Sequence, residues 1–309
     1  MQLVTGGAGF IGSHIVARLL ADGQRVRVLD NFSTGKHANL APLRDSIELI
    51  EGDLRDPDAL QRAVAGCEVV YQQAALRSVP RSIDDPLANN EVNVTGILRL
   101  LIAAKSAGVR RVVYASSSSV YGDDPTLPKV ETQTPRPISP YAASKIMGEY
   151  YCRIYSQLYG LETVSLRYFN VFGPRQDPES KYAAVIPRFI TAALAGQPLE
   201  VHGDGLQSRD FTYIDNVVSA NLLAGRAPDV AGEAFNIACG DRFSLLDVVE
   251  KIELALGHKV ERAHEPARAG DVKHTLADID KARRLLGYEP LIGFAEGMRH
   301  TVAWFQSNA

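Results

Sequence analysis

The sequence predicts an α/β protein: a doubly wound parallel sheet followed by a smaller α+β lobe. Two patterns support this prediction. Short β-branched runs alternate with longer helical stretches, which is typical of a sheet built from strand–helix–strand units with right-handed crossovers. Most of the short runs are continuously apolar, as parallel strands covered on both faces are.

The elements follow one another in a regular order. Six strands are predicted, at Gln2–Thr5, Arg25–Asp30, Ile47–Glu51, Glu68–Gln73, Arg111–Ala115 and Thr163–Tyr168. Helices are predicted between them, at Gly12–Asp22, Pro57–Gly66, Val94–Ala107 and Tyr141–Leu158. Several of these helices are followed by a glycine, the residue best suited to the left-handed conformation that ends a helix.

After Tyr168 the pattern becomes less regular and richer in Gly and Pro loops. Ala234–Ala238 is a candidate for a strand that returns to the sheet, and Ser244 is a candidate N-cap for an amphipathic helix at Leu245–Leu256. We therefore expect a nucleotide-binding domain at 1–170 with a return of 211–239. A second lobe would comprise 171–210 and 240–309.

Composition excludes several classes of protein. With 309 residues, 46% hydrophobic residues and 22% charged residues, the chain suits a globular enzyme with two lobes. A net charge of -3 argues against nucleic acid as a partner, and no apolar run is long enough to span a membrane. The opening MQLVTGG has no export signal pattern, and the three widely spaced cysteines suit reduced thiols, so we expect a cytoplasmic protein. Neither the cysteines nor the histidines have the spacing of a metal site.

A glycine-rich turn joins the first predicted strand to the first helix. In Thr5–Gly12, glycines stand at the spacings of a dinucleotide-binding fingerprint, where they permit a tight turn and close approach of the backbone to a pyrophosphate. Asp30 ends the second strand, where an acid accepts hydrogen bonds from a ribose 2′-OH and repels a 2′-phosphate. The sequence therefore predicts a Rossmann domain that prefers NAD to NADP. Asp53, which we expect to end the third strand, is placed to meet the adenine.

A second pattern indicates acid–base chemistry. Tyr141 and Lys145 stand one helical turn apart and share a face of the predicted helix. A neighbouring ammonium lowers the pKa of a tyrosine, which is otherwise a poor base at neutral pH. The serine run Ser116–Ser119 ends another strand, at the edge of the sheet where α/β proteins bind ligands.

Together these motifs resemble the extended short-chain dehydrogenase/reductases, and within them the NDP-sugar 4-epimerases. The resemblance spans nearly the whole chain. It is carried by TGGAGFIG, Asp30-Asn31, Asp53-Leu54, Gln73-Ala74-Ala75, Asn93, ASSSSVYG, SPYAASK, LRYFNVFGPRQDP, YAAVIPRF, GDGLQSRDFTYIDN and RAGDVKHTLADIDKA. The last five segments are similar to UDP-hexose 4-epimerases that accept N-acetylated sugars.

The resemblance implies a role for each matching residue. Tyr141 would be the base, Lys145 its electrostatic partner, and Ser117 the hydroxyl at the sugar O4, with Ser116 or Ser118 in its place if the register slips. NAD would be held by Gly6, Gly9, Phe10, Ile11, Gly12, Asp30, Asn31, Ser33, Gly35, Asp53, Leu54, Gln73, Ala74, Ala75, Asn93, Tyr141, Lys145 and Tyr168. The UDP-sugar would be held by Ser117, Tyr141, Asn170, Ala184, Val185, Arg209, Arg268, Asp271 and Thr275.

The family hosts several reactions after a shared oxidation at C4. Related dehydratases and decarboxylases carry acidic residues just after the catalytic serine, where this chain has Ser118 and Ser119. The resemblance therefore implies a reversible 4-epimerase of UDP-glucose/UDP-galactose and of UDP-GlcNAc/UDP-GalNAc. The alternatives are a UDP-glucuronate 4-epimerase and, more remotely, an inactive NAD-binding sensor.

Three further expectations concern substrate and assembly. Arg77, Ser78 and Arg81 follow the fourth strand and could serve a sugar 6-carboxylate, an acetamido group or the phosphates. Thr275 stands where similar epimerases differ in side-chain size, so a residue this small would admit an acetamido group. In the family, the helices Val94–Ala107 and Tyr141–Tyr159 pair across a two-fold axis, which implies a homodimer.

Overall fold

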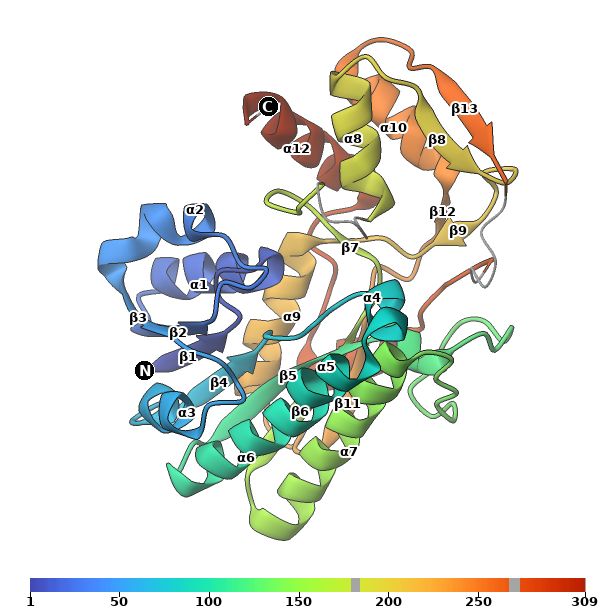
Figure 1. Cartoon of the computed structure of the whole chain (residues 1–309). Helices are drawn as coiled ribbons and strands as arrows, with labels where there is room; N and C mark the ends of the chain where they lie inside the picture. Colours follow the sequence, from blue (N-terminus) through green and yellow to red (C-terminus); the bar gives the residue numbers. More distant parts are fainter. Residues whose placement is uncertain (179–183, 267–272, 309) are drawn as a thin grey trace.

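The structure is a computed structural model that describes residues 1–178, 184–266 and 273–308. Its centre is a seven-stranded, wholly parallel sheet in the order β11-β6-β5-β4-β1-β2-β3 (Figure 1). The strands are β1 (Gln2–Thr5), β2 (Val26–Asp30), β3 (Ile47–Glu51), β4 (Val69–Gln72), β5 (Arg111–Ser117), β6 (Glu162–Tyr168) and β11 (Glu233–Ile237). The order reverses between β1 and β4, and ligands bind at such a switch point in doubly wound sheets.

The predicted fold class and all six predicted strands are confirmed. The candidate strand at Ala234–Ala238 is β11, which pairs with β6 at one edge of the sheet. β5 extends two residues beyond its predicted end at Ala115, so Ser116 and Ser117 lie in the strand.

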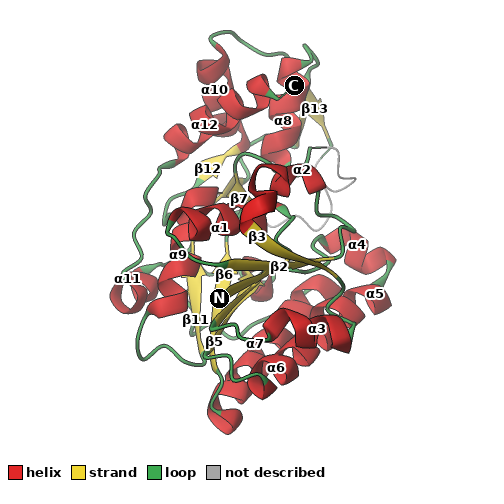
Figure 2. Cartoon of the chain, turned by 90° about the vertical axis from the view of Figure 1, so that its left-hand side faces the viewer, coloured by secondary structure: helices red, strands yellow, loops and turns green. Residues whose placement is uncertain are grey.

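Helices cover both faces of the sheet (Figure 2). One core lies under α3 (Pro57–Val64), α6 (Gly96–Ser106) and α7 (Pro140–Tyr159), and the other under α1 (Phe10–Ala21) and α9 (Ile214–Arg226). Neighbouring residues of β1 divide between the two cores: Leu3 packs in the first and Val4 in the second. A strand covered on both faces is apolar at successive positions, such as Leu3 and Val4, which explains why continuous apolar runs mark these strands in the sequence.

A smaller group of elements lies beyond the carboxyl edge of the sheet, at the top of Figure 1. It contains α8 (Val185–Leu194), α10 (Leu245–Leu256), α12 (Phe294–Ser307) and the paired strands β8 (Leu199–His202) and β13 (Arg262–Glu265). Two short ladders join it to the sheet: β7 (Val171–Phe172) with β10 (Thr212–Tyr213), and β9 (Ser208–Arg209) with β12 (Phe243–Ser244).

The predicted N-cap of α10 is confirmed. The Ser244 hydroxyl accepts a hydrogen bond from the Asp247 backbone N–H at 3.1 Å, and the Asp247 carboxylate accepts one from the Ser244 backbone N–H at 2.7 Å. Reciprocal bonds of this kind satisfy two donors that a helix start would leave unpaired.

Short helices complete the described chain: α2 (His37–Leu40), η1 (Ala41–Ser46), α4 (Val79–Asp84), α5 (Pro86–Asn90), η2 (Glu91–Thr95), η3 (Ser118–Tyr121) and α11 (Asp280–Leu286). Although α11 falls within the predicted second lobe, it contacts β11 and α9. The division into two lobes stays a prediction. No helix in the described ranges is both long and apolar enough to cross a membrane.

Candidate active site

A cavity of about 330 Å³ opens at the carboxyl edge of the sheet, next to the ends of the neighbouring strands β1 and β4. It brings together most of the residues predicted to hold NAD. These are Gly6, Gly9, Phe10, Ile11, Gly12, Asp30, Asn31, Ser33, Gly35, Asp53, Leu54, Gln73, Ala74, Ala75, Tyr141, Lys145 and Tyr168. Because these residues come from segments far apart in the chain, only the folded sheet can gather them.

The glycine-rich turn forms one wall of this cavity. Gly6 has φ +67°, and a Cβ there would lie 2.7 Å from the backbone nitrogen of Ala74. A Cβ on Gly12 would lie 2.1 Å from the carbonyl oxygen of Gly6. Side chains are therefore excluded at both positions, and the N-terminus of α1 faces the cavity with unpaired backbone N–H groups. A dinucleotide's diphosphate fits such a surface.

Asp30 ends β2 as predicted, and its carboxylate also holds two backbone segments together by hydrogen bonds. It accepts hydrogen bonds from the backbone N–H groups of Ala8 and Phe32, each at 2.8 Å. Burial raises the pKa of Asp30, while these two backbone donors act in the opposite direction. Asp30 therefore ties the glycine-rich turn to the loop after β2, besides lining the cavity.

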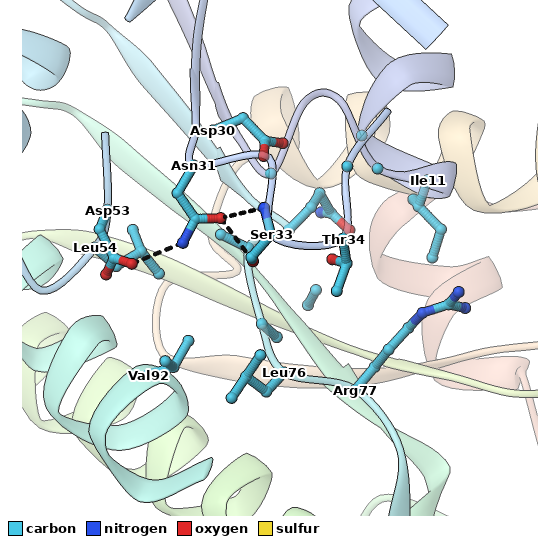
Figure 3. A pocket seen from close by; sticks show the side chains of 18 of the residues that line it. Ile11, Asp30, Asn31, Ser33, Thr34, Asp53, Leu54, Leu76, Arg77 and Val92 are labelled. Carbon is cyan, nitrogen blue, oxygen red and sulfur yellow. Dashed lines mark hydrogen bonds between the residues drawn. The ribbon is translucent and has the colours of Figure 1, made fainter. Parts of the chain in front are cut away.

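Asp53 lies in a loop, because β3 ends at Glu51 and not at Asp53 as expected. Its carboxylate accepts a hydrogen bond from the Asn31 amide at 2.7 Å (Figure 3). It accepts another from the Arg55 guanidinium at 2.9 Å. The bond from Arg55 is the main reason that the pKa of Asp53 is lowered to about 2. Asp53 is thus a fixed anion at the wall of the cavity beyond β3.

Asn93 is the predicted cofactor residue that does not line the cavity. It is buried, and its side chain both accepts from the backbone N–H of Leu76 at 2.8 Å and donates to the Leu76 carbonyl at 2.9 Å. Leu76 itself lines the cavity. The structure therefore places Asn93 behind the wall, where it holds the loop after β4 in shape.

Tyr141 and Lys145 lie on one face of α7, as their spacing predicts. The Lys145 Nζ atom is 5.8 Å from the centre of the Tyr141 ring and donates a hydrogen bond to the Ala115 carbonyl at 2.7 Å. Burial raises the pKa of Tyr141, so the expected net lowering by Lys145 is wrong for the protein alone. A hydrogen bond from Ser117 and the charge of Arg77 act against this burial.

The structure distinguishes the serines of the run. The hydroxyl of Ser116 donates to the buried carboxylate of Glu149 and is not directed at Tyr141. Ser117 acts against the effect of burial on the pKa of Tyr141, and its side chain caps the short helix η3. The Ser119 hydroxyl is buried and has no hydrogen-bond partner among the described residues. Ser117 is therefore the serine whose position fits the predicted register.

A second cavity, of about 290 Å³, is lined mainly by residues of α8, β8, β7 and β9. Asn170, Ala184, Val185 and Arg209, all predicted to contact the substrate, line it. Thr275 lies beside it, because its hydroxyl oxygen accepts a hydrogen bond from the Asn170 amide at 3.3 Å. The predicted substrate residues Arg268 and Asp271 lie outside the described residues.

Some lining residues of the first cavity, such as Thr34, Leu76 and Val92, were not predicted as ligands, whereas Arg77 and Arg81 were predicted as candidates to meet the substrate. Figure 3 shows Thr34, Leu76 and Val92 lining it, and Arg77 extending into it from the loop after β4. Arg77 is exposed, and Arg81 lines the same cavity. The positions directly after each strand were the signal that could have found most of them, since loops at the carboxyl edge line such cavities. No cluster of possible metal ligands occurs among the residues that the structure describes.

Comparison with known proteins agrees with this geometry. Residues 2–238 match the family described as the NAD dependent epimerase/dehydratase family. The chain belongs to this family.

Individual relatives span the whole chain. A UDP-glucose 4-epimerase of Mycolicibacterium smegmatis is 42% identical over 311 residues, which is 99% of each chain. The structure of a UDP-N-acetylglucosamine 4-epimerase from Methanobrevibacter ruminantium, in complex with UDP-N-acetylmuramic acid, has a TM-score of 0.95 at 42% identity and covers 100% of this chain and 98% of its own. The structure of a Thermus thermophilus UDP-glucose 4-epimerase in complex with NAD has a TM-score of 0.91 at 39% identity, with 100% of each chain covered.

Proposed function

We propose that this protein is an NAD-dependent UDP-hexose 4-epimerase, in which Tyr141 exchanges a proton with the sugar O4. The observation that carries the proposal is that Tyr141 and Lys145 line the first cavity near the end of β5, with Ser117 acting on Tyr141 and no acidic residue among the described lining residues at this end. The acids among the described lining residues are Asp30 and Asp53, which follow β2 and β3. Three strand spacings, roughly 14 Å, separate β2 from β5. Elimination of water or carbon dioxide needs acid–base groups beside the sugar, whereas epimerisation needs none besides Tyr141.

Each residue has a defined task in this reaction. Tyr141 in its phenolate form removes the O4 proton, and Ser117 keeps the hydroxyl aligned by hydrogen bonding. Lys145 supplies a fixed positive charge one helical turn away. Gly6, Gly12 and the N-terminus of α1 would hold the diphosphate of NAD, which when bound would supply the acceptor and donor of the C4 hydride.

The second cavity is suited to hold the UDP part of the substrate. Arg209 offers a guanidinium to the diphosphate, while Ala184 and Val185 offer backbone and apolar contacts to uracil. Arg268 and Asp271 are proposed partners of the phosphate and of the ribose. The nucleotide is held firmly while the sugar is held loosely. The 4-keto sugar can therefore turn over and receive the hydride on its opposite face.

One assay separates this enzyme from an inactive sensor. Purified protein is incubated with UDP-glucose without added NAD, and UDP-galactose is measured. Product is expected, because the hydride is returned in every cycle and retained cofactor suffices. If purified protein whose bound NAD has been verified forms no product from any UDP-hexose, the proposal is wrong.

UDP-glucuronate is the second candidate substrate, because Arg77 and Arg81 line the first cavity and could meet a 6-carboxylate. Comparing kcat/KM for UDP-glucose, UDP-N-acetylglucosamine and UDP-glucuronate decides between them. We expect the two neutral sugars to be preferred. A higher kcat/KM for UDP-glucuronate would replace the proposed substrate by this one.

We also propose a homodimer formed by α6 and α7, which pack side by side on one face of the sheet (Figure 1). Met147, Tyr150, Ile154 and Leu158 are exposed on α7 and recur at helical spacing, so they form an apolar stripe. Light scattering should give twice the chain mass, and Ile154→Glu should give a monomer. A wild-type monomer would contradict the proposed dimer.

We also propose a cytoplasmic location. The unpaired thiols of Cys67, Cys152 and Cys239 support it.

A further inference from the structure

A buried ion pair lies directly behind the proposed catalytic groups. Glu149 stands one helical turn after Lys145 on α7, on the same face. Its carboxylate accepts hydrogen bonds from Arg167 on β6, at 2.8 Å from Nη2 and 3.0 Å from Nε. The side chains of Glu149 and Arg167 are 6% and 5% exposed. A charge pair this well shielded from water acts strongly on neighbouring charges.

Further hydrogen bonds hold both members of the Glu149–Arg167 pair in place. The Ser116 hydroxyl on β5 also donates to Glu149, and Ser116 stands opposite Arg167 in the register of the two strands. Arg167 donates a further hydrogen bond to the Tyr121 hydroxyl at 2.8 Å, which in turn donates to Asn236 on β11 at 2.7 Å. The Glu149 carboxylate is therefore held at one place between α7, β5 and β6.

Lys145 is buried in the same region and needs an anion nearby to stay charged. Burial lowers the pKa of Lys145 to about 8, while Cys152 and Glu149 act in the opposite direction. Burial also raises the pKa of Cys152, so that its thiol is neutral near pH 8. Tyr114 and Tyr141, whose rings lie 5.2 and 5.8 Å from Nζ, have raised pKa values and are neutral as well. Glu149 is thus the anion that acts on Lys145 among the described groups around it.

On the helices packed against α7, the charged groups are exposed: Arg81 and Asp84 on α4, Glu91 on η2, and Arg99 and Lys105 on α6. On the strands, Arg111 of β5 is buried, but it is paired with Glu162 of β6 at the far end of the two strands. Exposed charges are screened by water and salt, so their effect on a buried ammonium is small.

We propose that Glu149 is a positioning residue of the reaction, whose carboxylate, fixed by Arg167 and Ser116, keeps the Lys145 ammonium protonated beside Tyr141. The inference rests on the proposed function, in which Lys145 acts as a cation. In this proposal Glu149 contacts no substrate, and by keeping Lys145 charged it sets the pH range in which Tyr141 works as the base.

The test is Glu149→Gln in NAD-loaded protein, with two readouts. The first is the titration of the Lys145 side chain, followed by NMR in lysine-labelled protein and assigned by its absence in Lys145→Met. The second is the dependence of kcat on pH. Because activity is lost as Lys145 loses its proton with rising pH, both midpoints should move down by at least about one pH unit.

Glu162→Gln is the matched control. Glu162 pairs with Arg111 across the same two strands, six register positions from the Ser117–Tyr168 pair, which is roughly 20 Å. This variant also breaks a Glu–Arg pair between β5 and β6, yet it should leave both midpoints in place. Equal shifts in the two variants would show a general effect of loosening the sheet and would overturn the proposal.

Glu149→Gln leaves Arg167 buried without its anion, which destabilises the folded state. The double variant Glu149→Gln/Arg167→Met removes both charges and is expected to fold. It should still lower the Lys145 midpoint, although less than the single variant. Unchanged Lys145 titration in folded variant protein would overturn the proposal. Lack of epimerase activity in wild-type protein would instead refute the proposed function, and the NMR titration would still test the role of Glu149.

Discussion

Replacing Thr275 by tyrosine should stop epimerisation of N-acetylated UDP-hexoses and spare UDP-glucose/UDP-galactose. Thr275 lies beside the second cavity, and its hydroxyl oxygen accepts hydrogen bonds from the Asn170 amide at 3.3 Å and from the Asp210 backbone N–H at 3.4 Å. A tyrosine would carry an aromatic ring into this space, where we propose that the acetamido group passes as the sugar turns. A C2 hydroxyl is far smaller and should still pass.

The size of the effect has two parts. Each of the two lost hydrogen bonds is worth about 1 kcal/mol. Their lengths of 3.3 and 3.4 Å make them weak hydrogen bonds. Together they could lower kcat/KM by about 30-fold at most, and they would do so for both substrates alike. The steric block acts on the acetamido group alone. We expect it to lower the ratio of the two kcat/KM values by on the order of 10²-fold.

Measuring that ratio in three proteins tests the reasoning: wild type, Thr275→Tyr and Thr275→Val. Valine keeps the shape of threonine but cannot accept a hydrogen bond, so Thr275→Val should lower both kcat/KM values and leave their ratio unchanged. If Thr275→Tyr also leaves the ratio unchanged, Thr275 does not control access of the C2 substituent. If Thr275→Val changes the ratio as much as Thr275→Tyr, the hydrogen bonds and not the size of the side chain decide specificity.

Three further predictions concern the chemistry and the cofactor. Tyr141→Phe should lower kcat at least ~10²-fold with UDP binding unchanged by calorimetry, and a smaller loss would mean that another group is the base. Ser117→Ala should impair turnover because Ser117 counteracts the effect of burial on Tyr141, whereas Ser119→Ala should have little effect; equal losses would disprove this assignment. Nucleotide extracted from the purified protein should be NAD, and Asp30→Ala should raise the share of NADP. Recovery of mainly NADP from wild type would refute the role of Asp30.

Much of the nucleotide-binding half could be predicted because its signals are local. A strand covered on both faces must be apolar at successive positions, and the turn between β1 and α1 requires glycine for reasons of backbone geometry. The spacing of Tyr141 and Lys145 places them on one helical face wherever that helix lies. Short elements such as α4 and α5 were not predicted, since a helix of one or two turns has too few positions to show a period.

The second half of the chain is harder to predict, because its elements are fixed by distant partners. β9 and β12 are two-residue strands that exist through their pairing with each other, and α11 packs on the edge strand β11. Asn93, in the first half, matches a residue of the family pattern, but its side-chain amide forms hydrogen bonds with the Leu76 backbone behind the cavity wall. Its role depends on where η2 meets the loop after β4, and no spacing in the sequence reveals that contact.

Local patterns were therefore enough to predict the fold class, the strands of the sheet, the glycine-rich turn, and a tyrosine, a lysine and a serine run as candidate catalytic groups. Ser117 was singled out by the family resemblance and not by a local pattern, and only the folded sheet shows that the neighbouring Ser116 turns to Glu149. The electrostatics could not be predicted: the pKa of Tyr141 is raised and that of Lys145 is lowered because segments far away in the chain bury both side chains. The hydrophobic period and the local backbone geometry depend on residues that are neighbours in the sequence. Burial and charge pairing arise only when distant segments come together.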